Sequence, residues 1–328
     1  MDEVTSAESP LEAAAGAAGR HATEAFTLLG NETRLAVLLA LWEAYDPHAS
    51  DNAVSFSRIL DRVETDDPGN LSYHLDKLAD QFVRQLEEGD GYELRETGLA
   101  LVRTVIAGAG VRDTILETTE IDQRCPFCDG TTAIRYGDGV VVHLCTECEG
   151  GGPAQTDLDG FLSAVRFDPA GLEDRRADEI RAASRVAAAR EVRSLFDGLC
   201  PACSGRVDGW LDCCTDHDPT GNCGNCGMKL AAWARFQCRV CKNHSVSSPK
   251  QLALFHPAVV SFYDDHGVST RRRADDPDSV ERVWGLVDDH EMEIVSEDPP
   301  RVVVGVSRGE EEVRLTFDET ADVADVGR

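Results

Sequence analysis

Lysine is scarce in this sequence, and so is any long run of apolar residues. Only four of the 328 residues are Lys, whereas Asp and Glu number 60, and the formal net charge is −28. Such a surface repels polyanions, which excludes indiscriminate nucleic-acid binding. An acidic, Lys-poor composition is typical of proteins that work at very high salt, where the Debye length falls to ~3 Å at 1 M. We therefore expect a halophilic source.

The sequence also lacks a segment that would cross a membrane. The longest stretch without a charged residue, 251–263, contains Pro257 and is shorter than the ~20 apolar residues that span a bilayer. The first ten residues are acidic where a secretory signal is basic. We expect a cytoplasmic protein with no membrane partner and with its twelve cysteines reduced. The C-x-x-C pairs then predict metal sites and not disulfides.

Length and composition predict an α+β chain of several domains. The expected segments are a flexible tail over 1–20, a winged helix-turn-helix domain over 21–112, a first zinc ribbon over 121–152, a connecting helix over 165–198, a second zinc ribbon with a C-terminal helix and strands over 199–318, and a fraying tail over 319–328.

The N-terminal domain is predicted from the order of its periodic segments. Asn31 is placed to cap a helix whose apolar face contains Leu35, Leu38, Leu39 and Trp42. Further helices are expected over 55–63, 70–82 and 96–107, with strands at 83–86 and 92–94 before the last one. This is the order of a winged helix-turn-helix. The last helix is expected to mediate homodimerisation of the chain.

The third helix of that domain is the predicted DNA reader. If Leu71, Leu75 and Leu78 are buried, its solvent face offers polar groups that can bond base edges and phosphates. These groups are Asn70, Ser72, Tyr73, Asp76 and Lys77, and Arg58 and Arg62 on the preceding helix are predicted phosphate contacts. Against this, residues 21–110 contain 16 acidic and seven basic residues, a net of −9, and the tip at 87–91 is acidic. A dimerisation or partner-binding domain therefore remains an alternative.

Three segments of this domain resemble the ArsR-like winged-helix transcriptional regulators. They are TLLGNETRL at 27–35, NLSYHLDKL at 70–78 and GYELRETG at 91–98. The similarity is greatest to the haloarchaeal group with zinc-ribbon modules, and it extends loosely to HPAVVSFYDDHGV at 256–268. The resemblance implies a dimeric regulator that binds double-stranded DNA. Metal-sensing family members carry cysteine pairs on the recognition helix, but no cysteine precedes Cys125 here, so that sensor site does not carry over.

The first cysteine module pairs Cys125-x-x-Cys128 with Cys145-x-x-Cys148 across a predicted hairpin over 132–144. Each C-x-x-C turns two thiolates toward one point, and the hairpin brings the two turns together, which predicts a four-cysteine zinc site. Because the segment has few large apolar residues, we expect the metal to supply much of its folding free energy. His143 is expected on the hairpin surface and not as a ligand.

The second module holds eight more cysteines: Cys200, Cys203, Cys213, Cys214, Cys223, Cys226, Cys238 and Cys241. Eight thiols can serve two metal ions, with Cys213, Cys214 or His217 completing the second site, or Cys213 and Cys214 can be idle thiols. The family resemblance favours Cys238 and Cys241 as partners of Cys200 and Cys203. The expected cofactor is Zn²⁺, two ions with room for a third.

No enzymatic pattern accounts for these cysteines. A thiol–disulfide oxidoreductase needs its C-x-x-C at a helix start in a βαβ unit, and a zinc deaminase needs H-x-E with P-C-x-x-C. A zinc ion held by four protein thiolates has no open position for water, so structural ribbons and no enzymatic activity are expected. Two alternatives to the regulator are a zinc-ribbon adaptor for protein partners, with the helix-turn-helix as its dimerisation core, and a thiol- or metal-responsive regulator.

The C-terminal part is expected to pack a helix over 257–266 against strands at 301–306 and 312–317. Arg271–Arg273 is the only dense basic cluster in the sequence. This cluster can bind a phosphate or an acidic partner. The commoner arrangement for such a run is a solvated loop whose arginines pair with nearby acidic residues, here Asp275 and Asp276.

Overall fold

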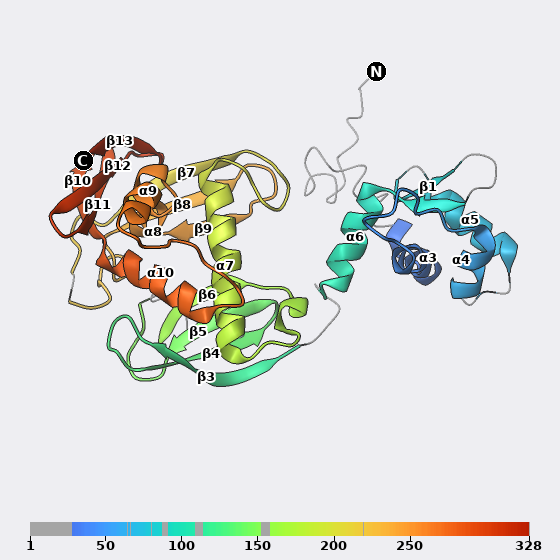
Figure 1. The fold of residues 1–328 in the computed structure, drawn as a ribbon, viewed down its shortest axis with the longest axis horizontal. Coiled ribbons are helices and arrows are strands. Elements are labelled where there is room, and N and C mark those ends of the chain that lie inside the picture. Colours follow the sequence, from blue (N-terminus) through green and yellow to red (C-terminus); the bar gives the residue numbers. More distant parts are fainter. Residues whose placement is uncertain are drawn as a thin grey trace, which may run out of the picture. The chain divides into compact units, whose positions relative to one another are not determined.

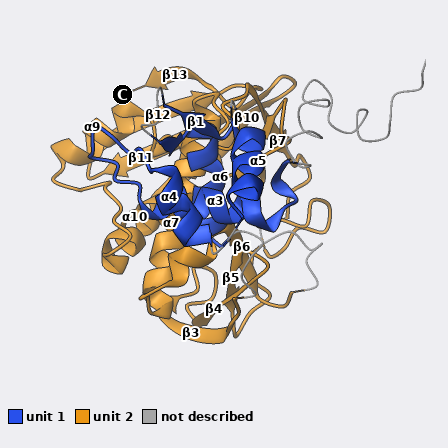
Figure 2. Cartoon of the chain, turned by 90° about the vertical axis from the view of Figure 1, so that its right-hand side faces the viewer, with its two compact units in different colours: residues 1–111 blue, residues 112–328 orange. Residues whose placement is uncertain are grey.

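The computed structural model describes residues 28–63, 65, 67–79, 81–86, 91–108, 114–151, 158–218 and 220–327. The chain divides into two compact units, 1–111 and 112–328 (Figure 2). The predicted tail over 1–20 and the acidic tip at 87–90 lie outside the described residues.

The first unit contains its elements in the predicted order. They are α3 (Glu32–Glu43), α4 (Phe56–Val63), α5 (Pro68–Leu78), β1 (Val83–Gln85), β2 (Tyr92–Leu94) and α6 (Glu96–Ile106), and β1 pairs antiparallel with β2. Asn31 caps α3 as expected, since its side chain accepts a hydrogen bond from the Arg34 amide at 3.1 Å. Helix α5 starts two residues before the predicted position because Asp67 caps it and Pro68 occupies its first turn.

The core of the first unit confirms the buried face of α5 and corrects that of α3. Leu71, Leu75 and Leu78 are almost fully buried. On α3 the buried side is formed by Val37, Leu38 and Leu41, whereas Leu35 and Leu39 remain 38% and 39% exposed. Backbones approach closely where α6 begins, because a Cβ on Gly98 would lie 2.3 Å from the Phe82 carbonyl oxygen.

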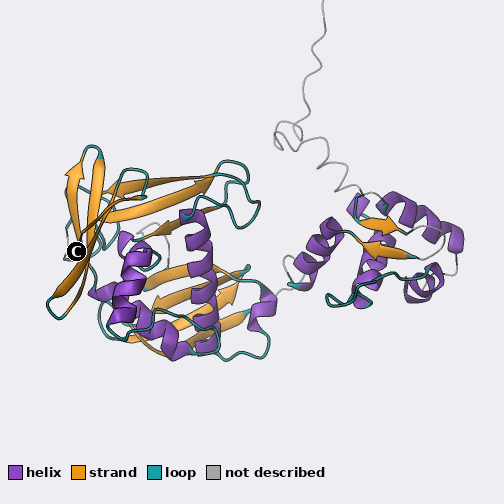
Figure 3. Ribbon diagram, turned by 45° about the horizontal axis from the view of Figure 1, so that its top comes forward, coloured by secondary structure: helices purple, strands orange, loops and turns teal. Residues whose placement is uncertain are grey.

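In its described residues, the second unit contains three antiparallel sheets and the helices that pack on them (Figures 1 and 3). The first sheet has the order β3 (Leu116–Arg124), β4 (Thr131–Gly137), β5 (Val140–Cys145), β6 (Phe161–Arg166). After the 3-10 turn η3 (Pro169–Leu172) and helix α7 (Ala177–Phe196) comes a sheet of β7 (Val207–Cys213), β8 (Ala232–Cys238) and β9 (His244–Ser247). Helices α8 (Pro249–Ala253), α9 (Pro257–Asp265) and α10 (Pro277–Asp289) precede the sheet of β10 (Glu291–Glu297), β11 (Pro300–Arg308), β12 (Glu311–Phe317) and β13 (Val323–Gly327).

Helix α7 packs against both cysteine-bearing sheets and against α10 (Figure 1). Buried polar groups fix this packing. Arg181, which is 3% exposed, approaches His143 Nδ1 at 2.9 Å, and the guanidinium of Arg185 lies 3.4 Å from the centre of the Trp284 ring. The predicted connecting helix is therefore a shared support for the two sheets.

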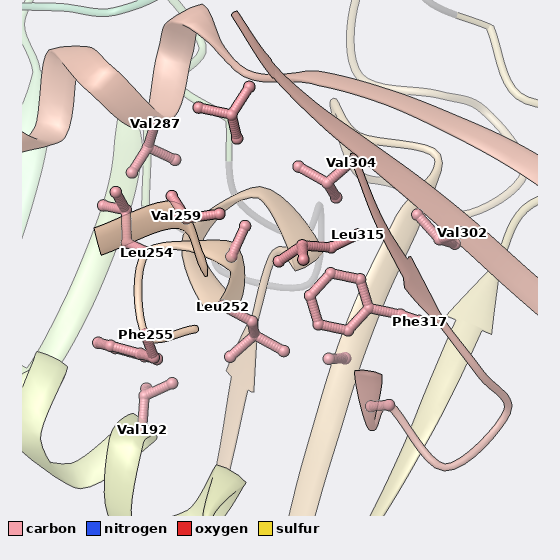
Figure 4. Packing of buried hydrophobic residues seen from close by; sticks show 14 of the residues in the cluster. Val192, Leu252, Leu254, Phe255, Val259, Val287, Val302, Val304, Leu315 and Phe317 are labelled. Atoms are coloured by element: carbon pink, nitrogen blue, oxygen red, sulfur yellow. The ribbon is translucent and has the colours of Figure 1, made fainter. Parts of the chain in front are cut away.

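The largest core of the described residues lies between α8, α9, α10, the last turns of α7, the sheet β7–β9 and the C-terminal sheet (Figure 4). Val302, Val304, Leu315 and Phe317 are fully buried from β11 and β12. The strands at 301–306 and 312–317 are confirmed, but the fraying tail over 319–328 is wrong. Residues of that segment form β13, which pairs with β12 through registers such as Leu315 with Val326. Strand pairing holds this segment although it offers little apolar surface.

No helix in the described part of the chain is long and apolar enough to cross a membrane.

Candidate functional site

Four of the C-x-x-C pairs fold into the same backbone turn. In each turn, the backbone N–H of the first cysteine donates a hydrogen bond to the carbonyl of the fifth residue after it. The backbone N–H of the fourth residue donates a second hydrogen bond to the carbonyl of that first cysteine. The fourth residue after the first cysteine has a positive φ: Asp129 (59°), Ser204 (57°), Gly227 (70°) and Lys242 (61°). This left-handed residue reverses the chain so that two sulfurs face one point, which is the knuckle that the spacing predicts.

The first cluster brings together Cys125, Cys128, Cys145 and Cys148 at one end of the sheet β3–β6. The Sγ atoms of Cys125 and Cys148 are 3.8 Å apart, and those of Cys128 and Cys145 are 3.5 Å apart. A disulfide requires ~2.05 Å, whereas sulfurs at ~2.3 Å from a tetrahedral zinc lie ~3.8 Å from each other. The distances therefore fit a shared metal ion, and the predicted ligand set is confirmed as a cluster.

The second cluster contains Cys200, Cys203, Cys238 and Cys241, the pairing that the family resemblance favours. The Sγ–Sγ distances are 3.6 Å for Cys200 and Cys241 and 3.5 Å for Cys203 and Cys238. A Cβ on Gly205 would lie 3.1 Å from Cys238 Sγ and 3.2 Å from Cys203 Sγ. The backbone thus closes directly over this metal position, and a larger residue at 205 would press on the sulfurs.

The third cluster lies at the opposite end of the sheet β7–β9 and has a mixed ligand set. Cys214, His217, Cys223 and Cys226 offer ligand atoms that all lie within 4.8 Å of one another. The Sγ atoms of Cys214 and Cys223 are 4.0 Å apart, and Cys226 Sγ lies 3.6 Å from His217 Nδ1. A sulfur and a nitrogen on one tetrahedral zinc are ~3.5 Å apart. Of the three candidates that the sequence offers, Cys214 and His217 complete this site.

Cys213 is the exception among the predicted ligands, because it belongs to none of the clusters in the described residues. It ends β7 next to Cys214, and successive strand residues point to opposite faces. Its side chain packs against the large core, and burial raises the pKa of its thiol. The interpretation of Cys213 as a metal ligand is therefore corrected, and the idle-thiol alternative describes it.

Each cluster has at least one cysteine whose thiol pKa is lowered, and the second cluster has two, Cys200 and Cys238. Backbone N–H groups of Cys241 and Val240 lower the pKa of Cys238 to about 6, and those of Asp218, Cys226 and Asn225 lower the pKa of Cys223 to about 6. Burial raises the pKa of Cys145, but the amides of Glu147 and Cys148 outweigh it and bring the value to about 7. Since the thiolate is the metal-binding form, these amide donors favour metal binding.

His143 is buried and not on the hairpin surface as expected. It is 2% exposed, and burial together with Arg181 and Arg185 holds the pKa of its imidazole far below the usual range. It lies outside the three clusters found in the described residues.

The predicted DNA-reading residues lie where the leucine stripe predicts them. Asn70, Ser72, Tyr73 and Lys77 are exposed on α5; Tyr73 is 54% exposed, and Lys77 Nζ is 5.5 Å from the centre of its ring. Arg58 is exposed on α4.

Arg62 departs from that expectation. Its Nη1 donates to the Ala40 carbonyl at 3.2 Å and its Nε lies 3.7 Å from a Glu43 carboxylate oxygen. Arg62 therefore ties α4 to α3 and is not a free phosphate contact. Its position four residues from Arg58 indicated a shared helix face, but α3 covers that part of the face, which the sequence does not show.

Residues 122–323 match the family model described as a domain of unknown function (DUF7351), and residues 22–105 match a second one, a domain of unknown function (DUF7347). No curated protein and no solved structure matches the chain.

Proposed function

The chain belongs to the DUF7351 family, whose matched region contains all three cysteine clusters, and we propose that it is a DNA-binding transcription regulator with structural zinc ribbons. The observation that carries this proposal is the exposed polar side of α5. Tyr73 and Lys77 project from a helix whose opposite side is locked into the core by Leu71, Leu75 and Leu78.

The order of elements in the first unit supports a winged helix-turn-helix. Helix α5 follows α4 after a short turn, and the hairpin β1–β2 and helix α6 come next. In that architecture the second helix of the pair enters the major groove and reads bases with its exposed side chains. Here Asn70, Ser72, Tyr73 and Lys77 are the readers, and Arg58 is the backbone contact from α4. The proposed dimer forms through α6.

The acidic charge of the first unit limits the electrostatic contribution to the proposed DNA binding. With 16 acidic and seven basic residues over 21–110, attraction to phosphates contributes little. At high salt this attraction contributes even less for any protein, because the logarithm of the binding constant falls with the logarithm of the salt concentration, with a slope of about −0.9 per phosphate contact. Specific contacts from α5 to base edges therefore supply most of the binding free energy.

The proposed zinc ions are structural. Two clusters offer four thiolates and the third offers three thiolates and one imidazole, so each fills a tetrahedral shell with protein ligands. No position is left for a substrate or a reactive water, in keeping with a protein that binds and does not catalyse.

A titration of labelled genomic fragments with the zinc-loaded chain at near-native salt tests the proposal. Tyr73→Ala and Lys77→Ala are expected to abolish sequence-selective binding. Arg282→Ala, an exposed helical arginine of the second unit, is the matched control and leaves it unchanged. Selective binding that survives both α5 substitutions contradicts the assignment.

A second function is favoured by the apolar surface of the first unit. Leu35 and Leu39 on α3 and Ile106 on α6 are 38–41% exposed, and together with the acidic charge they suit a protein interface better than a DNA interface. In this alternative the chain is a zinc-ribbon adaptor for protein partners, and the first unit mediates dimerisation. Purification from cells with a stoichiometric protein partner and no recoverable DNA would favour it.

A further inference from the structure

The second unit contains a basic cavity that the DNA-binding proposal does not use. Its volume is about 400 Å³, and it lies between α7, the turn around η3 and the loop before α10. Its charged lining consists of Arg175, Arg190, Arg271, Arg272, Arg273 and Asp275. Five positive charges and one negative charge give this cavity a net charge of +4 in a chain whose net charge is −28.

Only one of the five arginines that line this cavity forms a close ion pair in the described part of the chain. Arg273 is paired with Asp275 through two hydrogen bonds of 3.0 and 2.6 Å. Arg175 gives one bond, from Nη1 to the Gly171 carbonyl at 2.6 Å. Arg190 and Arg271 are exposed, and neither guanidinium group makes a hydrogen bond or a close ion pair among the described residues. Arg271 is near enough to Asp275 to help lower the pKa of that carboxyl, after the larger effect of Arg273. If the arginines of this loop served only to pair with Asp275 and Asp276, no such excess of positive charge would remain.

Arg272 adds a donor that lacks an acceptor. Its Nη2 atom is buried and makes no hydrogen bond in the described part of the chain. A buried charged donor without a partner costs free energy. Because this atom is closed to solvent, Arg272 adds positive charge to the cavity lining, and direct contacts to a ligand come from its exposed neighbours. Planar guanidinium groups bind phosphate oxygens in pairs, which makes arginine the preferred residue for phosphate recognition.

The remaining wall of the cavity is apolar. Ala183, Val186 and Ala187 are spaced to lie on one face of α7, and Phe167 and Gly171 continue the wall from the turn before it. Ligand pockets for small molecules span ~300 to 1,000 Å³ and combine apolar walls with a few charged groups. This cavity has that composition, and it is too small to receive a duplex.

We infer that this cavity binds a small phosphorylated ligand of the nucleotide class, with its phosphate between Arg190 and Arg271 and its apolar part against Ala183 and Ala187. The site lies within the second unit, so the inference does not depend on DNA binding by α5. A regulator with such a site would respond to a metabolite, with the ribbons as the frame that holds the pocket.

Isothermal titration calorimetry on the zinc-loaded full-length chain tests this inference. The probes are inorganic phosphate, pyrophosphate, AMP and ATP, titrated at low salt and at near-native salt. Saturable binding of a nucleotide is expected. The double substitution Arg190→Gln and Arg271→Gln should weaken it about tenfold or more, since each lost bond is charge-assisted. Arg282→Gln, on the exposed side of α10, is the control and leaves binding unchanged.

A substitution in the wall tests the ligand class separately. Ala187→Leu should weaken AMP and ATP while leaving inorganic phosphate and pyrophosphate almost unaffected, because it fills the apolar part only. Zinc content and the thermal transition of each variant confirm that it is folded. The inference is overturned if no probe saturates, if the double variant binds nucleotide as the parent does, if Arg282→Gln weakens it equally, or if duplex DNA alone competes for these arginines.

Discussion

The two units of the chain are stabilised in different ways. The first unit closes around an apolar core in which Leu38, Leu71, Leu75 and Leu78 are almost completely buried. The sheet β3–β6 of the second unit has a much smaller core, of Ile121, Ile134, Tyr136, Val141 and Ile180. A helical domain of this length can fold through apolar burial alone, whereas a small sheet requires an additional source of stability. We propose that metal ions bound at the cysteine clusters supply it.

Within the second unit this contrast holds only in part. The sheet β10–β13 has no cysteine, and its strands contribute Val302, Val304, Leu315 and Phe317 to the large core. The sheets β3–β6 and β7–β9 both end in a cluster of cysteines. The sheet β7–β9 combines both features, because two cysteine clusters lie at its ends and it also contributes Leu211, Ala234 and Phe236 to the large core. The contrast with the first unit is therefore sharpest for the sheet β3–β6.

Metal removal should have the largest effect. Structural zinc provides roughly 10–16 kcal/mol in zinc-finger peptides, so a strong chelator, or Cys238→Ser at one site, should unfold the cysteine-bearing sheets. The first unit should stay folded because its core contains no cluster. Hydrogen exchange with mass spectrometry, read separately for 28–108 and 114–327, measures this. Protection of β3–β5 that survives metal removal would show that the small core is sufficient.

A cavity in the first core should have the reverse effect. Leu75→Ala is expected to destabilise the first unit by about 2–5 kcal/mol, the usual cost of such a truncation, without loss of metal. Chemical denaturation followed by the helical signal, with metal analysis alongside, checks both points. Leu35→Ala on the exposed side of α3 is the control, and its effect should stay below about 0.5 kcal/mol.

Acid should weaken the second unit through His290. The side chain is 3% exposed, accepts a hydrogen bond from the Tyr263 hydroxyl at 2.9 Å and lies 2.8 Å from the Lys250 carbonyl. Burial lowers the pKa of His290 to about 4, below the ordinary value near 6.5. The unfolded chain therefore takes up a proton first, and stability is complete above pH ~6.5 and falls as the pH drops toward 4.

This loss amounts to at most about 3 kcal/mol. Urea denaturation of the second unit between pH 7 and 5, at constant metal content, should show a flatter pH dependence for His290→Gln than for the parent. Identical slopes would mean that other groups titrate in this range.

The third cluster should give the smallest effect on stability. His217→Ala is expected to lower the metal content from three ions per chain to two in native mass spectrometry, with a smaller change in unfolding than Cys238→Ser. The ligands of this cluster come from the segment between β7 and β8, whereas Cys238 is itself the last residue of β8. Cys213→Ser should leave all three ions bound, and loss of an ion in that variant would restore Cys213 as a ligand.

Much of this could be predicted from local sequence. The knuckles at Cys125 and Cys200 follow from spacing, and the buried face of α5 follows from its leucine period. The exposed positions of Leu35 and Leu39 could not be predicted, because their surroundings come from packing between helices. The strand pairing of β13 and the choice of Cys214 with His217 likewise depend on contacts between segments far apart in the sequence.

The position of α7 beside both cysteine-bearing sheets determines how this unit can be divided. Arg181 and Arg185 are covered by β5 and α10, respectively, and Glu191 forms an ion pair with Arg166 of β6 at 2.6 Å. A cut before or after this helix would leave uncompensated charge and bare aliphatic surface on both fragments. The two cysteine-bearing sheets thus share one supporting helix, and we expect neither to remain folded when it is excised or exchanged alone.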